Sequence, residues 1–470
     1  MNSKNIMRIA VVSLLALGAT ACGKDKDENN QSSENGENTP KVEILDSREL
    51  SYEEMVNGMF DSEIYGEDPE GNNGDEENVF ADMMAQIKDG FKDDVADALE
   101  EEGGSNGLFW DDYTSEVLTI KYTTVDALGN PLELSGTLSV GKINGKYMKV
   151  KNLMLHTHPT AFDEDMLDMV DFSCRTADGL AVLAPHYEGF GITAARKQTY
   201  LCQKLIGRQC ADMIPAAIEV LNSLGIEVAD DMGTYIVGYS QGGGNALATA
   251  RYLQEEAPAA LRTMANVKKV NAGAGPYDPY ATFQHWLATD KVSMSVVLPM
   301  VISGLMQGHP DIMAGIKLTD YFSEQYLSTG IVQAIENNTV NQLGLGAVAV
   351  DGKDELKSIN LGGSGIMMYW MRFSGIMSDE VKDENSHIRK ALEEALKAEV
   401  VTDWTPQFPV EFFTSKTDNV IPVDANARAT YNKFLAAGAN VTLEENSLAS
   451  DHILAQMAWM LRINVQKAYK

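Results

Sequence analysis

The chain has 470 residues, 44% of them hydrophobic and 22% charged, so it can form one large globular domain with additions. Its formal net charge is −31 at pH 7. A chain this acidic repels nucleic acids and anionic membrane surfaces, which argues against a DNA or RNA partner.

The first residues have the features of an export signal. Lys4 and Arg8 precede an apolar run, and small residues end this run directly before Cys22. We therefore expect residues 1–21 to be a signal peptide. The sequence Ala-Thr-Ala-Cys resembles the lipobox of bacterial lipoproteins, with Ala19 where that family usually has Leu. This resemblance implies a lipid on Cys22 and a membrane anchor, and a plain secretory signal with an incidental cysteine is the alternative.

An acidic segment follows the expected cleavage point. Residues 22–45 are rich in Lys, Asp, Glu, Asn, Ser and Gly and lack apolar periodicity, which predicts a tether. Its first residues, GKDKDENN, resemble the tract that routes some lipoproteins to the outer face of an outer membrane. A solvated linker has a similar composition. We expect an outer-membrane lipoprotein, and both cell-surface exposure and a simple linker remain open.

Short apolar patches then alternate with acidic stretches. This pattern predicts that residues 46–112 form an acidic helical extension on the surface of the main domain. The stretch DPEGNNGDEEN does not fit a calcium-binding EF-hand loop, because Asn73 stands where that loop requires glycine. A solvated acidic loop is the better interpretation.

Strand and helix signals alternate from residue 113 onward. The runs SEVLTIKYTTVD and PLELSGTLSV flank the turn ALGN and predict an antiparallel hairpin. Further strands are expected at residues 150–158, 179–187, 233–240, 267–275, 409–418 and 440–447, with helices at 200–224, 241–256, 425–438 and 453–469. Strands that alternate with helices and carry continuous apolar runs predict an α/β fold with a mostly parallel sheet covered on both faces.

A long connection interrupts this alternation. Residues 276–404 have their own apolar content and helical periodicity, which predicts an inserted cap rather than a loop. The core then consists of residues 113–275 and 405–470. The most apolar run of the cap cannot span a bilayer, because Pro299 and Gly304 interrupt it.

A serine stands at the junction of one expected strand and helix. In TYIVGYSQGGGNALATA, Ser240 lies between Gly238 and Gly242, with strand formers before it and helix formers after it. This context is typical of a nucleophile elbow, in which glycines let the strand and helix approach closely. The alternative is a glycine-rich turn without a catalytic role.

With these residues the chain resembles the α/β-hydrolase family, and within it the secretory lipases and related serine esterases with a large cap. The resemblance covers about residues 113–468. It implies the α/β-hydrolase fold, with a mostly parallel central sheet, helices on both faces and an inserted, mainly helical cap. It also implies that Ser240 is the nucleophile, raised at the C-terminal edge of the sheet.

The family places an acid and then a histidine after the serine. Of the seven histidines, three precede Ser240 and three fall in the cap. His452 alone follows the penultimate strand, and it becomes the expected general base. Helix capping is its alternative role.

Asp418 is the expected orienting acid. It ends a predicted strand in the sequence DNVIP, which resembles the family's acid loop Asp-x-x-Val-Pro with Ile421 in place of Val. Asp424 and Glu411 are weaker candidates, and Asp451 is expected to face solvent.

An oxyanion hole needs two N–H donors. The residue after the nucleophile, Gln241, supplies one. The family's second donor lies in a His-Gly-x motif, which corresponds here to His158, Pro159 and Thr160. Proline replaces the glycine, and the expected donor is the N–H of Thr160.

Other segments also resemble the family. APHYEGFGI is similar to its Pro-Asp-Tyr-x-Gly-x-Gly segment, with His186 replacing Asp, and AGAGPYD is similar to the junction where the cap begins. Tyr187 and Tyr277, together with His158, are therefore expected to line the pocket.

Three cysteines follow Cys22 in the sequence. Cys174, Cys202 and Cys210 allow at most one disulfide, and buried thiols are the alternative. Cys202 and Cys210 are poor mutual partners, because both lie on one expected helix.

These features predict an exported, lipid-anchored serine hydrolase that cleaves carboxylic esters through an acyl-serine intermediate. The resemblance implies no metal ion or organic cofactor, and the expected partners are an ester substrate and a membrane. The alternatives are a serine peptidase of the prolyl-oligopeptidase clan and an inactive surface binding lipoprotein on a hydrolase scaffold. Residues 41–107 are too few for the N-terminal propeller that such peptidases usually carry.

Overall fold

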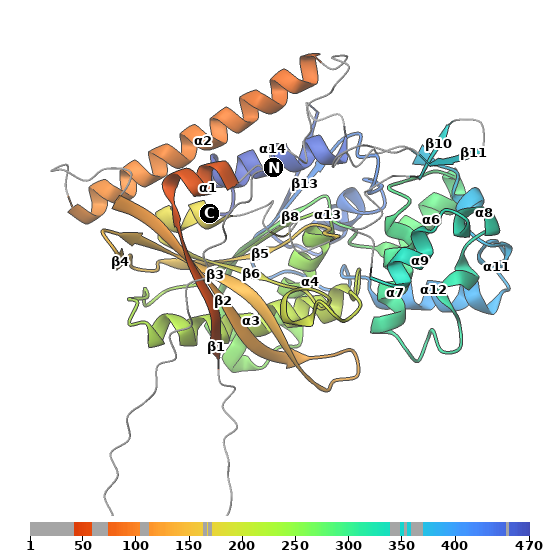
Figure 1. The fold of residues 1–470 in the computed structure, drawn as a ribbon, viewed down its shortest axis with the longest axis horizontal. Helices are drawn as coiled ribbons and strands as arrows, with labels where there is room; N and C mark the ends of the chain where they lie inside the picture. The colour runs from red at the N-terminus through yellow and green to blue at the C-terminus, as the bar shows by residue number, and fades with distance from the viewer. Residues whose placement is uncertain are drawn as a thin grey trace, which may run out of the picture. The chain divides into compact units, whose positions relative to one another are not determined.

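A mixed, mostly parallel sheet forms the centre of the fold (Figure 1). The computed structural model describes residues 42–58, 74–103, 112–162, 167, 172–338, 348–351, 355–358, 370–447 and 451–470, all within one compact unit of the chain. The expected signal peptide, Cys22 and nearly all of the tether lie outside the described residues.

Ten strands of the described residues make up this sheet. They are β1 (Glu43–Ser51), β2 (Tyr113–Val125), β3 (Pro131–Ile143), β4 (Lys146–Tyr147), β5 (Asn152–Thr157), β6 (Leu180–Pro185), β7 (Thr234–Tyr239), β8 (Val267–Gly273), β13 (Val410–Ser415) and β14 (Val441–Asn446). The order is β1-β2-β3-β6-β5-β7-β8-β13-β14, and β4 pairs with β3. Pairing is antiparallel from β1 to β6 and parallel from β6 to β14. The predicted α/β fold class is confirmed.

Helices cover both faces of the sheet (Figure 1). One face carries α3 (Gln203–Ser223), α4 (Gln241–Glu255), α5 (Ala259–Ala265) and α13 (Ala427–Ala436), and the other carries α1 (Tyr52–Gly58), α2 (Gly74–Gly103) and α14 (His452–Asn464). The strands serve both faces because successive side chains alternate between them. On β5, Leu153 and Leu155 pack with α3 and α4, whereas Met154 packs with α2 and α14.

The first described segment corrects one prediction. Residues 46–112 are not wholly helical, because Glu43–Ser51 forms the edge strand β1 along β2. Most of its side chains are exposed, so no apolar alternation marked the strand in the sequence. Backbone pairing holds it, together with ion pairs such as Glu43 with Lys121 at 2.8 Å and Glu49 with Lys142 at 3.3 Å. Charged side chains of this kind also protect a sheet edge from further pairing.

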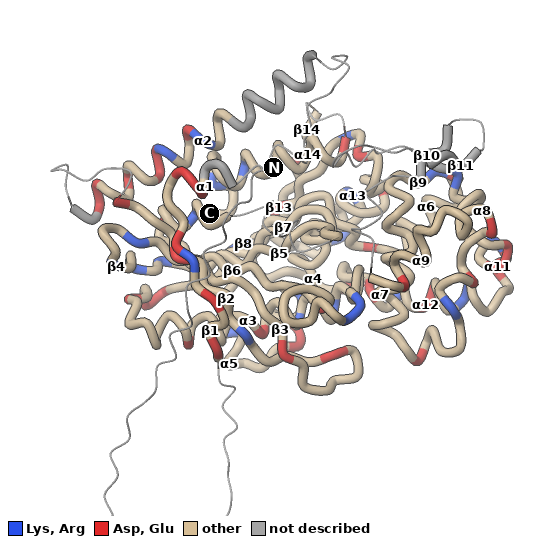
Figure 2. The backbone as a smooth tube through the Cα atoms, viewed as in Figure 1, with Lys and Arg blue, Asp and Glu red and all other residues tan. Residues whose placement is uncertain are grey.

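A buried charge cluster joins helix α2 of the acidic extension to the 3₁₀ turn Ser173–Asp178, which precedes β6. The guanidinium group of Arg175, which is fully buried, lies 2.6 Å from Asp94 of α2 and 2.9 Å from Asp178. Lys467 lies 2.6 Å from both carboxylates. Burial acts to raise the pKa of Asp178, but Arg175 and Lys467 outweigh it and lower this pKa. Figure 2 shows further acidic residues along β1 and α1.

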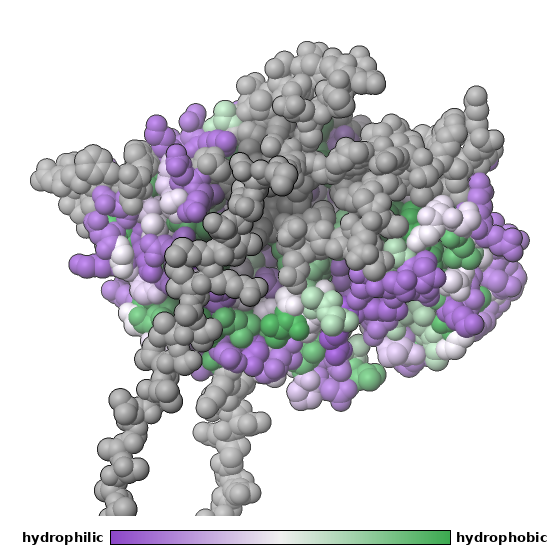
Figure 3. Space-filling model, viewed as in Figure 1, coloured by the Kyte–Doolittle hydropathy of each residue, from purple (hydrophilic) through white to green (hydrophobic). Residues whose placement is uncertain are grey.

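The cap is a separate layer of short helices with its own hydrophobic core. Its elements are α6 (Pro279–Thr289), β9 (Val292–Ser293), α7 (Val297–Gly308), α8 (Glu324–Leu327), α9 (Ile331–Glu336), β10 (Val348–Asp351), β11 (Glu355–Ser358), β12 (Trp370–Met371), α10 (Phe373–Ile376), α11 (Asp379–Lys382) and α12 (His387–Ala398), and a 3₁₀ turn at Leu318–Tyr321. Helix α12 is amphipathic, since Leu392, Ala395 and Leu396 face the cap core. Figure 3 shows hydrophilic residues over the outer helix α11. Within the described residues, none of the helices has the length and apolar content to cross a membrane.

The three cysteines of the described residues are buried thiols rather than a disulfide pair. Cys174 donates its thiol to Oδ1 of Asn464, and Cys202, at the N-cap of α3, donates to the carbonyl oxygen of Gly304 at 3.1 Å. The sequence left a disulfide and buried thiols as alternatives, and the structure shows buried thiols.

Candidate active site

Ser240 occupies the sharp turn between β7 and α4. Its backbone has φ 56° and ψ −125°, a strained conformation that residues with side chains seldom adopt. The turn is held by a hydrogen bond from the N–H of Ser240 to the carbonyl oxygen of Gly273, 2.9 Å long. The surrounding structure maintains this strained turn, and the turn places the Ser240 hydroxyl at the carboxyl end of the sheet.

Glycine is required on both sides of this serine. A Cβ atom at Gly238 would lie 2.2 Å from Oγ1 of Thr157, and one at Gly242 would lie 2.0 Å from the carbonyl oxygen of the same residue. Both distances are far shorter than van der Waals contact. The end of β5 thus packs directly on the turn, and the glycines of GYSQG are set by this close approach.

The side chain of His452 lies between Ser240 and Asp418. Its Nε2 atom is 2.9 Å from Oγ of Ser240, and its Nδ1 atom is 2.7 Å from Oδ2 of Asp418. A carboxylate only accepts hydrogen bonds, so Nδ1 carries the proton and Nε2 presents its lone pair to the serine hydroxyl. The side chains of His452 and Asp418 are only 2% and 0% exposed. The structure therefore brings together the three residues that the sequence singled out.

Asp418 is fixed by its own loop after β13. Its Oδ1 atom accepts hydrogen bonds from the N–H groups of Val420 at 2.9 Å and Ile421 at 2.8 Å. The other oxygen, Oδ2, then points to the imidazole of His452. The segment DNVIP is therefore a turn that orients a carboxylate, which is what its residues suggested.

The other candidate acids have structural partners elsewhere. Glu411 forms ion pairs with two basic side chains, and Asp424 pairs with Arg428 at 2.6 Å. Asp451 caps α14 by accepting the N–H of Leu454 at 2.9 Å. Asp451 is therefore the N-cap of α14.

Two residues that support His452 were missed in the sequence. The hydroxyl group of Tyr239 donates to the carbonyl oxygen of His452 at 2.7 Å, and Oδ1 of Asn419 accepts the N–H of His452 at 3.2 Å. Each is the sequence neighbour of a singled-out residue, Ser240 or Asp418. That adjacency is the only sequence signal they carry.

A pocket of about 770 Å³, its open mouth included, lies against Ser240. The core contributes the polar residues Ser240, Gln241 and Thr160, and also Tyr200, Leu201, Val420 and Ile421. Nearly all the remaining lining is apolar. Much of this apolar lining comes from the cap: Phe283, Trp286, Met294, Val297, Leu298, Val301, Ile302, Phe373, Met377, Leu392 and Leu396.

The two expected oxyanion donors lie on this pocket. Gln241 is the first residue of α4, where an N–H has no acceptor within the helix. Thr160 follows β5, and its hydroxyl is 2.7 Å from that of Tyr200. Both residues adjoin the pocket that contains Ser240, as donors to a bound oxyanion must.

We expected His158, Tyr187 and Tyr277 to line the pocket. This prediction is wrong, because none of them lines the pocket beside Ser240. His158 and Tyr187 are buried and stacked, with ring centroids 3.7 Å apart, and Tyr187 donates to the carbonyl oxygen of His158 at 3.0 Å. Tyr277 donates to the carbonyl oxygen of Ala272 at 2.8 Å. Their hydroxyl groups satisfy buried carbonyl oxygens, so these side chains stabilise the core. Burial lowers the pKa of His158 to about 3, so this imidazole is neutral at pH 7.

A different group of side chains has the geometry to hold a metal ion. Cys202, His309 and Glu399 are the only such set of His, Cys, Asp and Glu side chains among the described residues. The set shares no residue with the Ser240 site.

Residues 164–343 match the secretory lipase family. The matched region contains Ser240 and ends before Asp418 and His452. No curated protein matches the chain.

The fold is similar to that of two solved structures. One is the rice cell wall degrading esterase LipA from Xanthomonas oryzae, with a TM-score of 0.57 and 18% identity over 78% of this chain and 94% of LipA. The other is a Legionella pneumophila protein assigned to the hydrolases, with a TM-score of 0.56 and 19% identity over 80% of this chain and 94% of that chain. These likenesses confirm the α/β-hydrolase fold. The family match confirms the resemblance to secretory lipases and assigns the chain to the carboxylic ester hydrolases.

Proposed function

We propose that this enzyme cleaves carboxylic esters through an acyl-serine intermediate, with Ser240 as nucleophile, His452 as general base and Asp418 as orienting acid. The observation that carries the proposal is the continuous hydrogen-bond chain from Asp418 through His452 to Ser240, beside an apolar pocket. Nucleophile, base and orienting acid in hydrogen-bond reach of one another are the requirement for an activated serine.

In the acylation step, Oγ of Ser240 attacks the ester carbonyl carbon while Nε2 of His452 takes the hydroxyl proton. The N–H groups of Gln241 and Thr160 stabilise the negative charge that develops on the carbonyl oxygen. Asp418 stabilises the imidazolium that forms. The intermediate collapses when His452 returns the proton to the departing alcohol oxygen, which leaves the acyl group on Ser240.

In the deacylation step, water replaces the alcohol. His452 removes one proton from the water, and the hydroxide attacks the acyl carbon. Collapse of the second tetrahedral intermediate releases the carboxylic acid and returns the proton to Ser240. The same three residues therefore serve both halves of the reaction, with no metal ion or organic cofactor required.

The pocket favours an acyl ester over a polar substrate. Its cap lining is built from aliphatic and aromatic side chains such as Trp286 and Leu298. Apolar groups gain about 25 cal/mol for each Å² of surface buried against such a lining. We therefore assign acyl esters of moderate chain length as the substrate class, rather than polysaccharides.

The proposal extends to the organisation of the chain. Residues 113–275 and 405–470 form the catalytic core, and residues 276–404 form the cap over Ser240. The secretory lipase match supports export of the protein. We assign residues 1–21 as the cleaved signal and Cys22 as the lipid-bearing residue of an outer-membrane lipoprotein, on the sequence features alone.

Release of p-nitrophenol from acetyl, butyryl, octanoyl and palmitoyl esters tests the function. The wild-type chain is expected to hydrolyse these esters, and Ser240→Ala should lower kcat by about 10⁵-fold to 10⁶-fold. Ser223→Ala is the matched control, because this serine ends α3 and only bonds the carbonyl oxygen of Val220. The acyl chain length with the highest kcat/KM would measure the depth of the pocket.

A fluorophosphonate probe separates the alternatives. If no ester is cleaved but the probe labels Ser240, the nucleophile is active and a peptide becomes the better substrate, as in the prolyl-oligopeptidase clan. Absence of both hydrolysis and labelling in a folded protein would refute the catalytic proposal and favour an inactive binding lipoprotein.

A further inference from the structure

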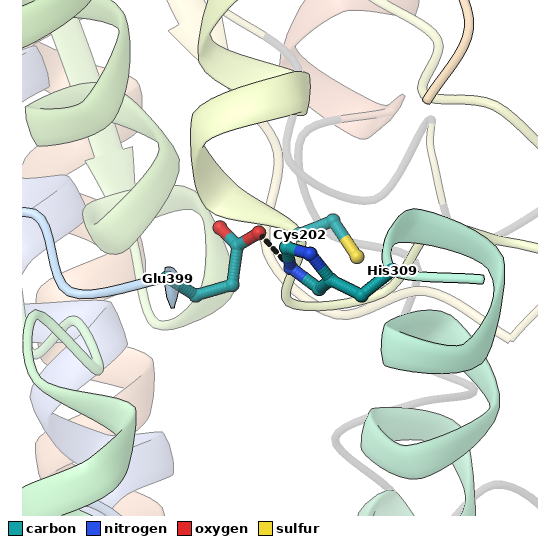
Figure 4. A group of neighbouring side chains, drawn as sticks. All are labelled: Cys202, His309 and Glu399. Carbon is teal, nitrogen blue, oxygen red and sulfur yellow. Dashed lines mark hydrogen bonds and ion pairs between the residues drawn. The ribbon is translucent and has the colours of Figure 1, made fainter. Parts of the chain in front are cut away.

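Cys202, His309 and Glu399 form a second converging group of side chains (Figure 4). They come from three separate segments. Cys202 is the N-cap of the core helix α3, whereas His309 and Glu399 are the C-caps of the cap helices α7 and α12. One ligand atom from each residue lies within 4.8 Å of those of the other two. The group therefore lies where the base of the cap meets the core.

The carboxylate of Glu399 is buried in this group. Its side chain is 3% exposed, and its Oε1 atom is 2.7 Å from Nε2 of His309. The other oxygen, Oε2, accepts the N–H of Lys204 in the first turn of α3 at 3.0 Å. A buried carboxylate is costly unless hydrogen bonds and a positive charge compensate it.

The thiol of Cys202 is held against helix α7 by close packing. A Cβ atom at Gly308 would lie 2.3 Å from the Cys202 sulfur, and one at Gly304 would lie 2.1 Å from the carbonyl oxygen of Tyr200. Leu201, directly before the cysteine, has the left-handed φ of 65°. This strained, tightly packed segment fixes the sulfur beside the turn that carries His309. Glycines at two adjacent turns of α7 make this approach sterically accessible.

We propose that Cys202, His309 and Glu399 bind a zinc ion that fastens the cap to the core. One sulfur, one nitrogen and one carboxylate oxygen form a ligand set that Zn²⁺ prefers, whereas Mg²⁺ and Ca²⁺ prefer oxygen ligands alone. The ion balances the charges of a thiolate and a carboxylate, so the buried site is neutral. Three protein ligands leave a fourth position for water. The proposed site shares no residue with the Ser240 site, and it adds a metal to a chain whose sequence implied none.

Zinc replaces protons at this site. The Cys202 thiol donates a hydrogen bond to the carbonyl oxygen of Gly304 at 3.1 Å, so it carries its proton in the absence of a cation. On binding, the thiol proton leaves to solvent, and the imidazole proton moves from Nε2 to Nδ1 as Nε2 becomes a ligand. Zinc binding therefore releases the thiol proton.

The proposed ion also holds two helices that line the substrate pocket. Val301 and Ile302 of α7 and Leu396 of α12 line the pocket, and both helices end at a proposed zinc ligand. Tyr200 and Leu201 of the core line it directly before Cys202. Zinc would thus hold cap and core together at the pocket without touching the reacting atoms.

Metal content and cobalt absorption test this proposal on the full chain, purified in detergent without a polyhistidine tag. We expect one zinc ion per chain, and Co²⁺ in its place should give a thiolate-to-metal absorption band. Cys202→Ser should abolish the band, and His309→Gln should weaken zinc binding at least about 100-fold. Cys210→Ser and His387→Gln are the matched controls, since they alter a buried thiol of α3 and a histidine of the cap outside the group.

Unfolding temperature provides a second measurement that does not depend on ester hydrolysis. Zinc should raise it in the wild-type chain and in both controls, and EDTA should reverse the rise. If Cys202→Ser does not fold, the cobalt band of the wild type and the zinc affinity of His309→Gln still decide the question. A wild-type chain that binds no zinc, or a cobalt complex without the thiolate band, would overturn the proposal.

Discussion

Replacement of Asp418 by asparagine should separate the orienting role of this residue from its structural role. The side chains of Asp and Asn have the same shape, so the amide oxygen can still accept the N–H groups of Val420 and Ile421. The amide NH₂ group would then face Nδ1 of His452 in place of Oδ2. Because NH₂ only donates, Nδ1 would become the acceptor and the proton would move to Nε2. His452 would then present an N–H to Ser240 instead of a lone pair.

This wrong tautomer removes the general base while the pocket stays intact. Loss of the correct tautomer in a serine triad lowers kcat by about 10⁴-fold, which corresponds to about 5.4 kcal/mol at about 1.36 kcal/mol for each factor of ten. KM should change little, because Asp418 does not line the pocket. Steady-state hydrolysis of p-nitrophenyl butyrate by Asp418→Asn and wild type measures both constants.

Asp451→Asn is the control for this prediction. Asp451 directly precedes His452 but caps α14 through the N–H of Leu454, a contact that asparagine can preserve. Its kcat should remain within a few-fold of wild type. If folded Asp418→Asn keeps kcat within tenfold of wild type, Asp418 does not set the tautomer and the proposed triad is wrong.

Three further predictions concern packing and pH. Gly242→Ala places a Cβ atom 2.0 Å from a carbonyl oxygen of β5. We therefore expect loss of soluble protein or of fluorophosphonate labelling. A folded, fully labelled variant would contradict the close packing. Tyr239→Phe removes the hydrogen bond to the carbonyl oxygen of His452 and should lower the free energy of unfolding in urea by about 1 kcal/mol to 3 kcal/mol, and an unchanged value would show that this bond adds nothing. Burial lowers the pKa of both His156 and His158 to about 3, so the unfolded chain binds their protons below pH 6.5 while the folded chain does not. The free energy of unfolding should therefore fall by about 1.4 kcal/mol per histidine for each pH unit as the pH drops from 6.5 toward 3. His156→Gln should reduce the slope of this free energy against pH by the contribution of one histidine. Equal slopes for the variant and the wild type would refute this account.

The strongest sequence signals came from local constraints. The elbow needs glycine on both sides of Ser240, since β5 packs against it at distances that exclude a Cβ atom. The loop after β13 needs Asp418 at its start, because two following N–H groups bind the carboxylate. Such requirements fall on residues that are close in sequence, so a single chain reveals them. The same reasoning found the alternating strands and helices of the core, whose apolar runs must be buried on both faces of the sheet.

Prediction failed where the position of a residue depends on distant packing. Strand β1 is exposed, so its residues lack the alternation that marks half-buried strands, and only the open edge of β2 determines its conformation. Tyr187 and Tyr277 belong to segments that resemble pocket motifs, yet each hydroxyl group bonds a buried carbonyl oxygen. A tyrosine near a site in sequence can face the pocket or the core behind it, and the surrounding side chains decide which.

The proposed zinc ligands show why such sites escape a single sequence. No short sequence motif contains all three residues, because His309 and Glu399 are 90 residues apart and Cys202 lies in the core, at the start of α3. They come together because the cap packs against the core at this point. Helix α7 contacts the start of α3, and α12 ends beside the first turn of the same helix. An inserted domain must be joined to its host at its base, where its entry and exit meet. A ligand from the host helix and one from the end of each of two cap helices would fix that junction while the pocket between cap and core stays open to substrate.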